Sequence, residues 1–220
     1  MHCGVTPSQF SQVEHVGTGH RLLFVGRLAA VKGLPMLLDS VKQLKETMPN
    51  IRLTIVGDGP DRQMLEAQTA EAGLNEQVQF VGYQSQAAVR DYLQQTDVFV
   101  LPSFAEGVPV VLMEAMMSGV PVVATQIAGV SELVIDGESG FLVPPSNVDI
   151  LCDRIQKLLA DGPLRQRFGQ KGAQKVQAEF DISQESQKLA KLIAKVTSDE
   201  DSVEAVSPAA KEEREAVLSA

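Results

Sequence analysis

Two glutamates in the middle of the chain have the spacing and the surroundings of residues that could do chemistry. Glu106 and Glu114, with seven residues between them, lie in the stretch EGVPVVLMEAMMSGVPVVAT. Glu106 follows an apolar run closed by Pro102 and Ser103, which predicts a loop at the end of a buried strand. Glu114 lies among apolar residues and good helix formers, where a carboxylate needs a partner. It is either a helix glutamate bonded to a nearby backbone group or lysine, or a residue that binds a ligand.

Two cations form a second candidate pair. Arg27 and Lys32 are five positions apart in GRLAAVKG, at the end of the apolar run LLFVG. A guanidinium binds phosphate as a planar fork, and an ammonium binds it as a point charge. Two solvated surface cations would give the same pattern, so the pair alone leaves phosphate binding open.

A predicted helix start lies between the two glutamates. The loop EGVPVV places Gly107 and the backbone amides of Val108, Val110 and Val111 there, and a helix start favours anions. Carboxylates accept charge-assisted hydrogen bonds from sugar hydroxyls. Cations for phosphate and carboxylates for hydroxyls together indicate a sugar nucleotide.

Six short apolar runs, rich in β-branched residues, alternate with helical patterns along the chain. They are LLFVG, IRLTIVG, VQFVG, DVFVLPS, PVVAT and GFLVPP. Runs that are apolar on both faces and separated by helices indicate a parallel sheet covered on both sides. We therefore expect an α/β fold with a doubly wound, Rossmann-like parallel sheet.

In such a sheet a ligand binds beyond the carboxyl ends of the strands. The segments that fall there are 26–27, 57–58, 82–83, 103–109 and Thr125. They are far apart in the sequence, but the fold predicts that they converge on one rim. Both candidate pairs contribute to this rim.

The chain divides into three parts by pattern. Residues 1–20 have no period and are expected to form a lead-in like an interdomain linker, and residues 21–195 are expected to form the domain. Residues 196–220 are expected to form an acidic tail that is either disordered or a frayed helix. The segment from 197 to the end carries seven acidic residues and two basic ones. The last helix of the domain is expected over residues 183–194.

Composition excludes several classes of function. The net charge of −9 argues against nucleic acid or an anionic membrane as the main partner. All three histidines lie in the first twenty residues, so neither a zinc site nor a Ser-His-Asp set within the sheet is expected. The two cysteines, Cys3 and Cys152, are far apart and predict a reducing, cytoplasmic compartment. No apolar run reaches membrane-spanning length, and no signal peptide is recognisable.

The common nucleotide-binding motifs are also missing. The first loop, GRLAAVKG, is not a glycine-rich turn that runs straight into a helix, and GDGPDR has Arg62 at the third glycine position. There is no Walker sequence. A nicotinamide cofactor is therefore not expected.

As a set, the motifs resemble the carboxyl-terminal half of a retaining, two-domain glycosyltransferase of the GT-B fold, the large family four class. The matching stretches follow the family's order over roughly residues 2–180; they are HCGVTPSQF, FVGRLAAVKGLPMLL, LTIVGDGP, VQFVGY, DVFVLPSFAEGVPVVLMEAMMSGVPVVAT and GVSELVIDGESGFLVPP. HCGVTPSQF resembles the family's interdomain linker, with Thr6 where the family usually has Asp. The resemblance implies that the acceptor domain, with a histidine near the reacting sugar carbon, is missing from this chain.

The resemblance also implies roles for the candidate residues. Arg27 and Lys32 would hold the diphosphate, and Glu106 would face the sugar hydroxyls; these three form the expected catalytic set. Glu114 would hold the ribose. The remaining donor contacts would come from Gly26, Tyr83, Gly107, Val108, Val110 and Val111, with the loop near Tyr83 binding the base.

The implied function is binding of a UDP-sugar or GDP-sugar for retaining transfer of a hexosyl group, with no metal and no cofactor. Two possibilities remain. The chain is either a working enzyme completed by a separate acceptor-domain chain, or a truncated, non-catalytic module that binds the sugar nucleotide. Self-association is a further expected consequence of the missing domain.

Overall fold

The computed structural model describes residues 4–14, 19–182, 186, 190 and 193. The described residues up to Asp181 belong to one compact unit, and those from Ile182 on belong to a second, smaller one. The helix expected over residues 183–194 lies outside the described residues except at isolated positions. The acidic tail from residue 196 lies wholly outside them.

The centre of the larger unit is a parallel sheet of six strands. The strands are β1 (Arg21–Val25), β2 (Arg52–Val56), β3 (Val78–Gly82), β4 (Val98–Leu101), β5 (Val122–Thr125) and β6 (Gly140–Val143). Their order is β3-β2-β1-β4-β5-β6, with every neighbouring pair parallel. This is the doubly wound order, which confirms the predicted fold class. The order reverses between β1 and β4, and such a switch point is where ligands bind.

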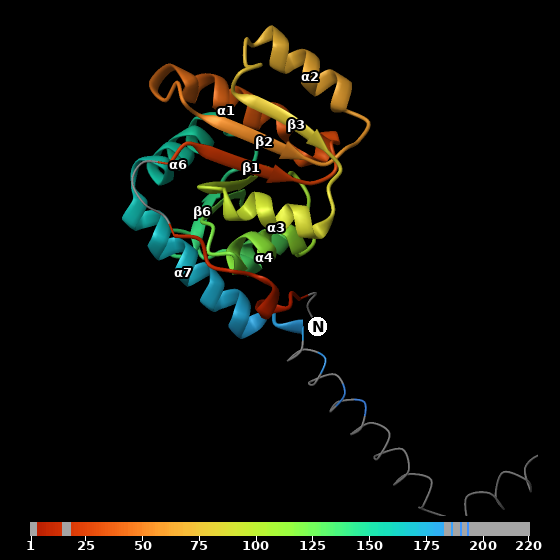
Figure 1. The fold of residues 1–220 in the computed structure, drawn as a ribbon, viewed down its shortest axis with the longest axis vertical. Coiled ribbons are helices and arrows are strands. Elements are labelled where there is room, and N and C mark those ends of the chain that lie inside the picture. Colours follow the sequence, from red (N-terminus) through yellow and green to blue (C-terminus); the bar gives the residue numbers. More distant parts are fainter. Residues whose placement is uncertain (1–3, 15–18, 183–185, 187–189, 191–192, 194–220) are drawn as a thin grey trace, which may run out of the picture. The chain divides into compact units, whose positions relative to one another are not determined.

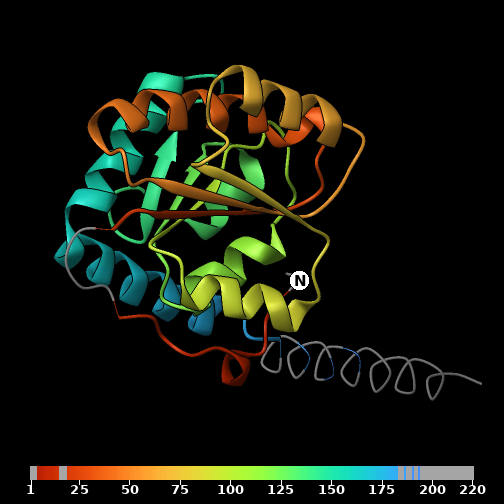
Figure 2. The same ribbon diagram turned by 45° about the horizontal axis from the view of Figure 1, so that its top comes forward.

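Helices cover both faces of this sheet. They are α1 (Leu34–Thr47), α2 (Arg62–Glu71), α3 (Gln86–Gln94), α4 (Val110–Met117), α5 (Ala128–Leu133), α6 (Val148–Ala160) and α7 (Gly162–Glu179). Figure 1 labels all of them except α5, and Figure 2 shows α1 and α2 on one side of the sheet with α3 and α4 on the other. The bounds of the strands lie within two residues of the six predicted apolar runs.

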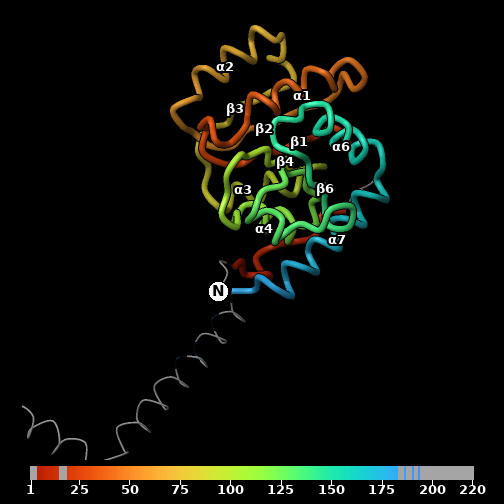
Figure 3. The backbone as a smooth tube through the Cα atoms, turned by 180° about the vertical axis from the view of Figure 1, so that it is seen from behind, coloured from red at the N-terminus to blue at the C-terminus, as the bar shows by residue number. Residues whose placement is uncertain are grey.

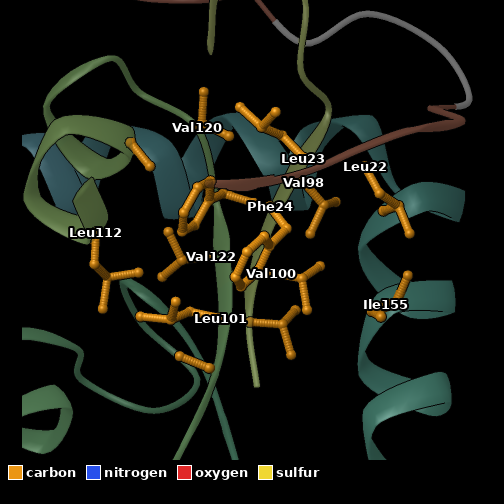
Figure 4. Close-up of a cluster of buried hydrophobic side chains, with 14 of the residues drawn as sticks. Leu22, Leu23, Phe24, Val98, Val100, Leu101, Leu112, Val120, Val122 and Ile155 are labelled. Atoms are coloured by element: carbon orange, nitrogen blue, oxygen red, sulfur yellow. The ribbon is translucent and has the colours of Figure 1, made fainter. Parts of the chain in front are cut away.

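Burial in the core on both sides of the sheet explains why the strand sequences are apolar on both faces. Every residue of β4 and of β5 is buried. Figure 4 shows the strand residues Phe24, Val100 and Val122 packed together, with Leu112 of α4 on one side and Ile155 of α6 on the other. Burying such side chains contributes about 1.5–3 kcal/mol each.

The helices α6 and α7 each begin at a residue whose side chain caps the helix. The side chain of Asn147 accepts a hydrogen bond of 2.9 Å from the Ile150 amide at the start of α6. Asp161 does the same for the Leu164 amide at 2.8 Å, at the start of α7. Each such cap contributes about 1 kcal/mol. None of the described helices is both long and apolar enough to cross a membrane.

The lead-in segment packs against the domain. The Val5 amide donates to the Phe180 carbonyl at 3.0 Å, and the Val13 amide donates to the Ser118 carbonyl at 2.9 Å. Figure 3 shows this red segment beside α7 and close to α4. Its lack of period reflects hydrogen bonding to the ends of α4 and α7 rather than membership of the sheet.

Candidate functional site

The loops that follow β1 and β4 meet at the switch point of the sheet. The Phe104 amide donates a hydrogen bond of 2.8 Å to the Val31 carbonyl, which joins the two loops directly. Gly33 lies at this junction with φ +65°, and a Cβ there would overlap the Pro102 carbonyl. A residue with a side chain would therefore be strained and would push the loops apart.

The two loops also share a charged contact. Lys32 Nζ lies 2.6 Å from Glu106 Oε1, and the two side chains are only 21% and 10% exposed. Lys32 is therefore not a solvated surface cation. The short 3₁₀ turn Ala30–Lys32 before Gly33 sets its position.

Arg27, from the same loop as Lys32, has a different environment. Its side chain is exposed, and its guanidinium forms no hydrogen bond or ion pair with the described residues. It lines a cavity of about 290 Å³ together with Gly26 and Tyr83. Arg27 is thus a positive charge in the lining of this cavity that is available to a ligand.

The same cavity contains residues that sequence reasoning did not assign to the site. Its lining is completed by Val25, Val56, Gly57, Asp58, Gln84 and Val89. Tyr83 is 83% exposed, so its ring is free to contact a ligand. The position of Asp58 directly after β2, on the predicted rim, was a signal for it. Gln84 gave no signal beyond its place next to Tyr83.

The start of α4 lies beside the Glu106 loop. Pro109 is the N-cap residue and provides no side-chain cap. The amides of Val108, Val110 and Val111 donate no hydrogen bond to the described residues, so they remain available to an anion. α5 packs closely against this loop, because a Cβ at Gly129 would overlap the Gly107 carbonyl.

Glu114 lies inside α4 and is 8% exposed. Burial raises the pKa of its carboxyl, and the charge of Arg90 on α3 partly opposes that rise. Its carboxylate forms no hydrogen bond or salt bridge with the described residues. Among the described residues, Glu114 is therefore bonded neither to a backbone group nor to a lysine, so that alternative is wrong. A buried carboxylate without a partner is a strong acceptor for ligand hydroxyls.

The predicted residues thus fall into three groups along one rim. Lys32 touches Glu106, and Arg27 shares the cavity with Gly26 and Tyr83. Glu114 lies within α4, the Val110 and Val111 amides are at its start, and the Val108 amide lies in the loop before it. Among the residues that the structure describes, no hydrogen bond or ion pair joins Glu114 to Glu106. Within the described ranges no three His, Cys, Asp or Glu residues form a cluster that could hold a metal ion. The rim combines cations and free amides for an anion with carboxylates for hydroxyls.

Comparison with known proteins identifies relatives over most of this domain. The family model described as "Glycosyl transferases group 1" matches residues 5–175. The alpha-D-kanosaminyltransferase of Streptomyces kanamyceticus is 32% identical over 169 residues, which cover 77% of this chain and 44% of that protein. The chain therefore spans less than half the length of this curated relative.

Solved structures agree with this match. Sucrose-phosphate synthase from Thermosynechococcus elongatus superimposes with a TM-score of 0.81 at 29% identity, over 90% of this chain and 52% of that one. Anabaena HepE, in a structure with UDP and glucose, gives a TM-score of 0.74 at 26% identity, over 80% and 48% of the two chains.

Proposed function

Because the chain belongs to the group 1 glycosyl transferases, we propose that it is the donor-binding half of a retaining hexosyltransferase. The observation that carries this proposal is the junction of the β1 and β4 loops at the switch point. It joins Lys32 to Glu106 and leaves Arg27 free on the same rim. One side of the junction offers positive charge for a diphosphate, and the other offers carboxylates for hydroxyls.

Each group then has a part in binding the donor. Arg27, Lys32 and the free amides at the start of α4 bind the diphosphate. Glu106 accepts hydrogen bonds from the sugar, and Glu114 accepts them from the ribose. The cavity beside Tyr83 receives the base, with the ring of Tyr83 and the valines of the lining as its apolar surface.

In the transfer step the bond between the sugar carbon and the diphosphate breaks, and a bond to the acceptor oxygen forms on the same face. The proton of the acceptor hydroxyl passes to the departing diphosphate. Negative charge develops on the diphosphate, and Arg27, Lys32 and the α4 amides would stabilise it. These groups replace a divalent metal in the proposed mechanism. The acceptor site belongs to the part of the relatives that this chain does not span, whether in a longer polypeptide or in a partner chain. The expected compartment remains a reducing one.

A binding screen tests this function. Calorimetry with UDP, GDP, ADP and their glucose conjugates, each with and without EDTA, should find one nucleotide series that binds. EDTA should leave its affinity unchanged. UDP is the first probe, because the related HepE structure was solved with UDP and glucose. Absence of binding in all series, or binding abolished by EDTA, would contradict the proposal.

The alternative is a module that binds the sugar nucleotide and carries out no transfer. This chain spans 44% of the length of the S. kanamyceticus relative. Adding the half of the relatives that this chain does not span, from an adjacent reading frame or a longer transcript, distinguishes the two. Transfer that appears only with that half present identifies a working enzyme, and its continued absence favours the binding module.

A further inference from the structure

We propose that Glu106 competes with the diphosphate for Lys32, so that their ion pair weakens the binding of a bare nucleoside diphosphate relative to a sugar nucleotide. This inference rests on the proposed function and makes Glu106 a residue that determines specificity. It starts from the contact between Lys32 Nζ and Glu106 Oε1. The two residues are 74 positions apart, so the fold itself brings them together.

The pair is formed by the two groups that are assigned to different parts of the donor. Lys32 is to meet the diphosphate, and Glu106 is to meet the sugar. With no donor between them, each is the partner of the other at 2.6 Å. A diphosphate that binds Lys32 must therefore displace a carboxylate of its own charge sign.

The displaced carboxylate then needs a new partner. The side chain of Glu106 is only 10% exposed. Water therefore solvates its carboxylate poorly once Lys32 binds the phosphate instead. A sugar nucleotide supplies hydroxyls that donate to Glu106, and a bare nucleoside diphosphate supplies none. With the full donor bound, both Lys32 and Glu106 therefore have a partner. With the diphosphate product bound, only Lys32 has one.

The same competition favours release of the product. After the sugar has left, Glu106 returns to Lys32 and the diphosphate loses part of its cationic site. Arg27 differs in this respect, because no carboxylate among the described residues pairs with it. Its contribution should be the same for the bare diphosphate and for the sugar nucleotide.

Two substitutions separate the contact from the charge. Glu106→Gln removes the charge, whereas Glu106→Asp keeps the charge but shortens the side chain and breaks the contact with Lys32. Glu179→Gln is the matched control, because it removes a carboxylate that pairs with Lys175 at 2.7 Å on α7. Calorimetry at constant ionic strength measures the affinity of each variant for UDP and for UDP-glucose.

We expect Glu106→Gln to tighten UDP binding by roughly three- to tenfold, the scale of one partly buried ion pair. Glu106→Asp should tighten it in the same direction, and both should weaken UDP-glucose. The preference for UDP-glucose over UDP should therefore fall by about tenfold or more. The control should change neither affinity.

Other outcomes overturn the inference. UDP affinity that stays the same or falls in both Glu106 variants would show that no competition exists, while the proposed function stands. Tighter binding in Glu106→Gln with wild-type affinity in Glu106→Asp would reduce the effect to simple charge repulsion without the contact. If wild-type protein binds neither UDP nor the GDP and ADP series, the inference and the proposed function fall together.

Discussion

Arg27 is the cation on the rim that is available to a ligand. It is exposed and has no ion-pair partner among the described residues. We therefore expect Arg27→Ala to weaken UDP binding by roughly ten- to a hundredfold, since a charge-assisted contact contributes about 1.5–3 kcal/mol. Calorimetry measures this directly.

The control for this prediction is Arg52→Ala. Arg52 is also exposed, but it lies at the first residue of β2, at the opposite end of the sheet from the rim. It should leave UDP affinity unchanged. Equal losses in both variants would mean that only the overall charge of the protein matters.

Glu114 makes a prediction about stability and pH. Burial raises the pKa of its carboxyl from an ordinary value of 4.5. The unfolded state therefore binds fewer protons than the folded state above that value, and the contribution of Glu114 to stability falls as the pH rises toward the folded pKa. Glu114→Gln should thus stabilise the protein at neutral pH by roughly 1 kcal/mol.

Urea unfolding at neutral pH and at about pH 4 measures this effect. The gain should shrink at the lower pH, because the carboxyl is then largely protonated in both states. Glu71→Gln, at an exposed position on α2, is the control and should give no gain. A gain in stability of Glu114→Gln that is independent of pH would contradict the account.

Glu114→Gln should also weaken the binding of UDP and of UDP-glucose alike, since both ligands carry the ribose.

At the level of elements, the site depends on how closely the β1 loop approaches the β4 loop. Gly33 and Gly73 both have positive φ, +65° and +67°. A Cβ at Gly33 would overlap the Pro102 carbonyl, whereas a Cβ at Gly73 would meet nothing within 4 Å. The two positions therefore differ in contact and hardly at all in backbone strain.

We expect Gly73→Ala to cost about 1 kcal/mol of stability from strain alone. Gly33→Ala should cost a further 1–3 kcal/mol or so from overlap, and it should weaken UDP binding because Lys32 lies on the displaced loop. Urea unfolding and calorimetry measure the two effects. Equal stability losses, with UDP affinity unchanged in both variants, would show that the junction of the loops is not needed.

For the whole molecule, we expect the 220-residue chain to bind donor and to transfer sugar at no useful rate by itself. Transfer requires the acceptor hydroxyl to be held against the sugar carbon with water excluded. The chain spans 44% of the length of the S. kanamyceticus relative, and the proposed donor rim carries exposed residues such as Arg27, Tyr83 and Gly107.

A transfer assay with matched donor and a panel of acceptors tests this expectation, with donor hydrolysis counted separately. Robust transfer by the purified monomer that is lost in Glu106→Gln would contradict it. Size-exclusion chromatography in the same experiment tests the expected weak self-association.

Some features of this protein were determined by the sequence alone. Short apolar runs rich in β-branched residues, separated by helical patterns, predicted the doubly wound sheet, because burial on both faces leaves a local signal in each strand. The loop position of Glu106 and the helical position of Glu114 followed from the Pro and Gly residues around them. Membership of the group 1 glycosyl transferases followed from motifs in a fixed order.

Other features depended on the tertiary structure, because they join residues that are distant in the sequence. The contact between Lys32 and Glu106 spans 74 positions, and the cavity beside Tyr83 includes Asp58 from another loop. The packing of residues 4–14 and the full burial of Arg165 in α7 left no local pattern either. The environment of Glu114 was also decided by the tertiary structure, because the charge that acts on its carboxyl, Arg90, comes from α3.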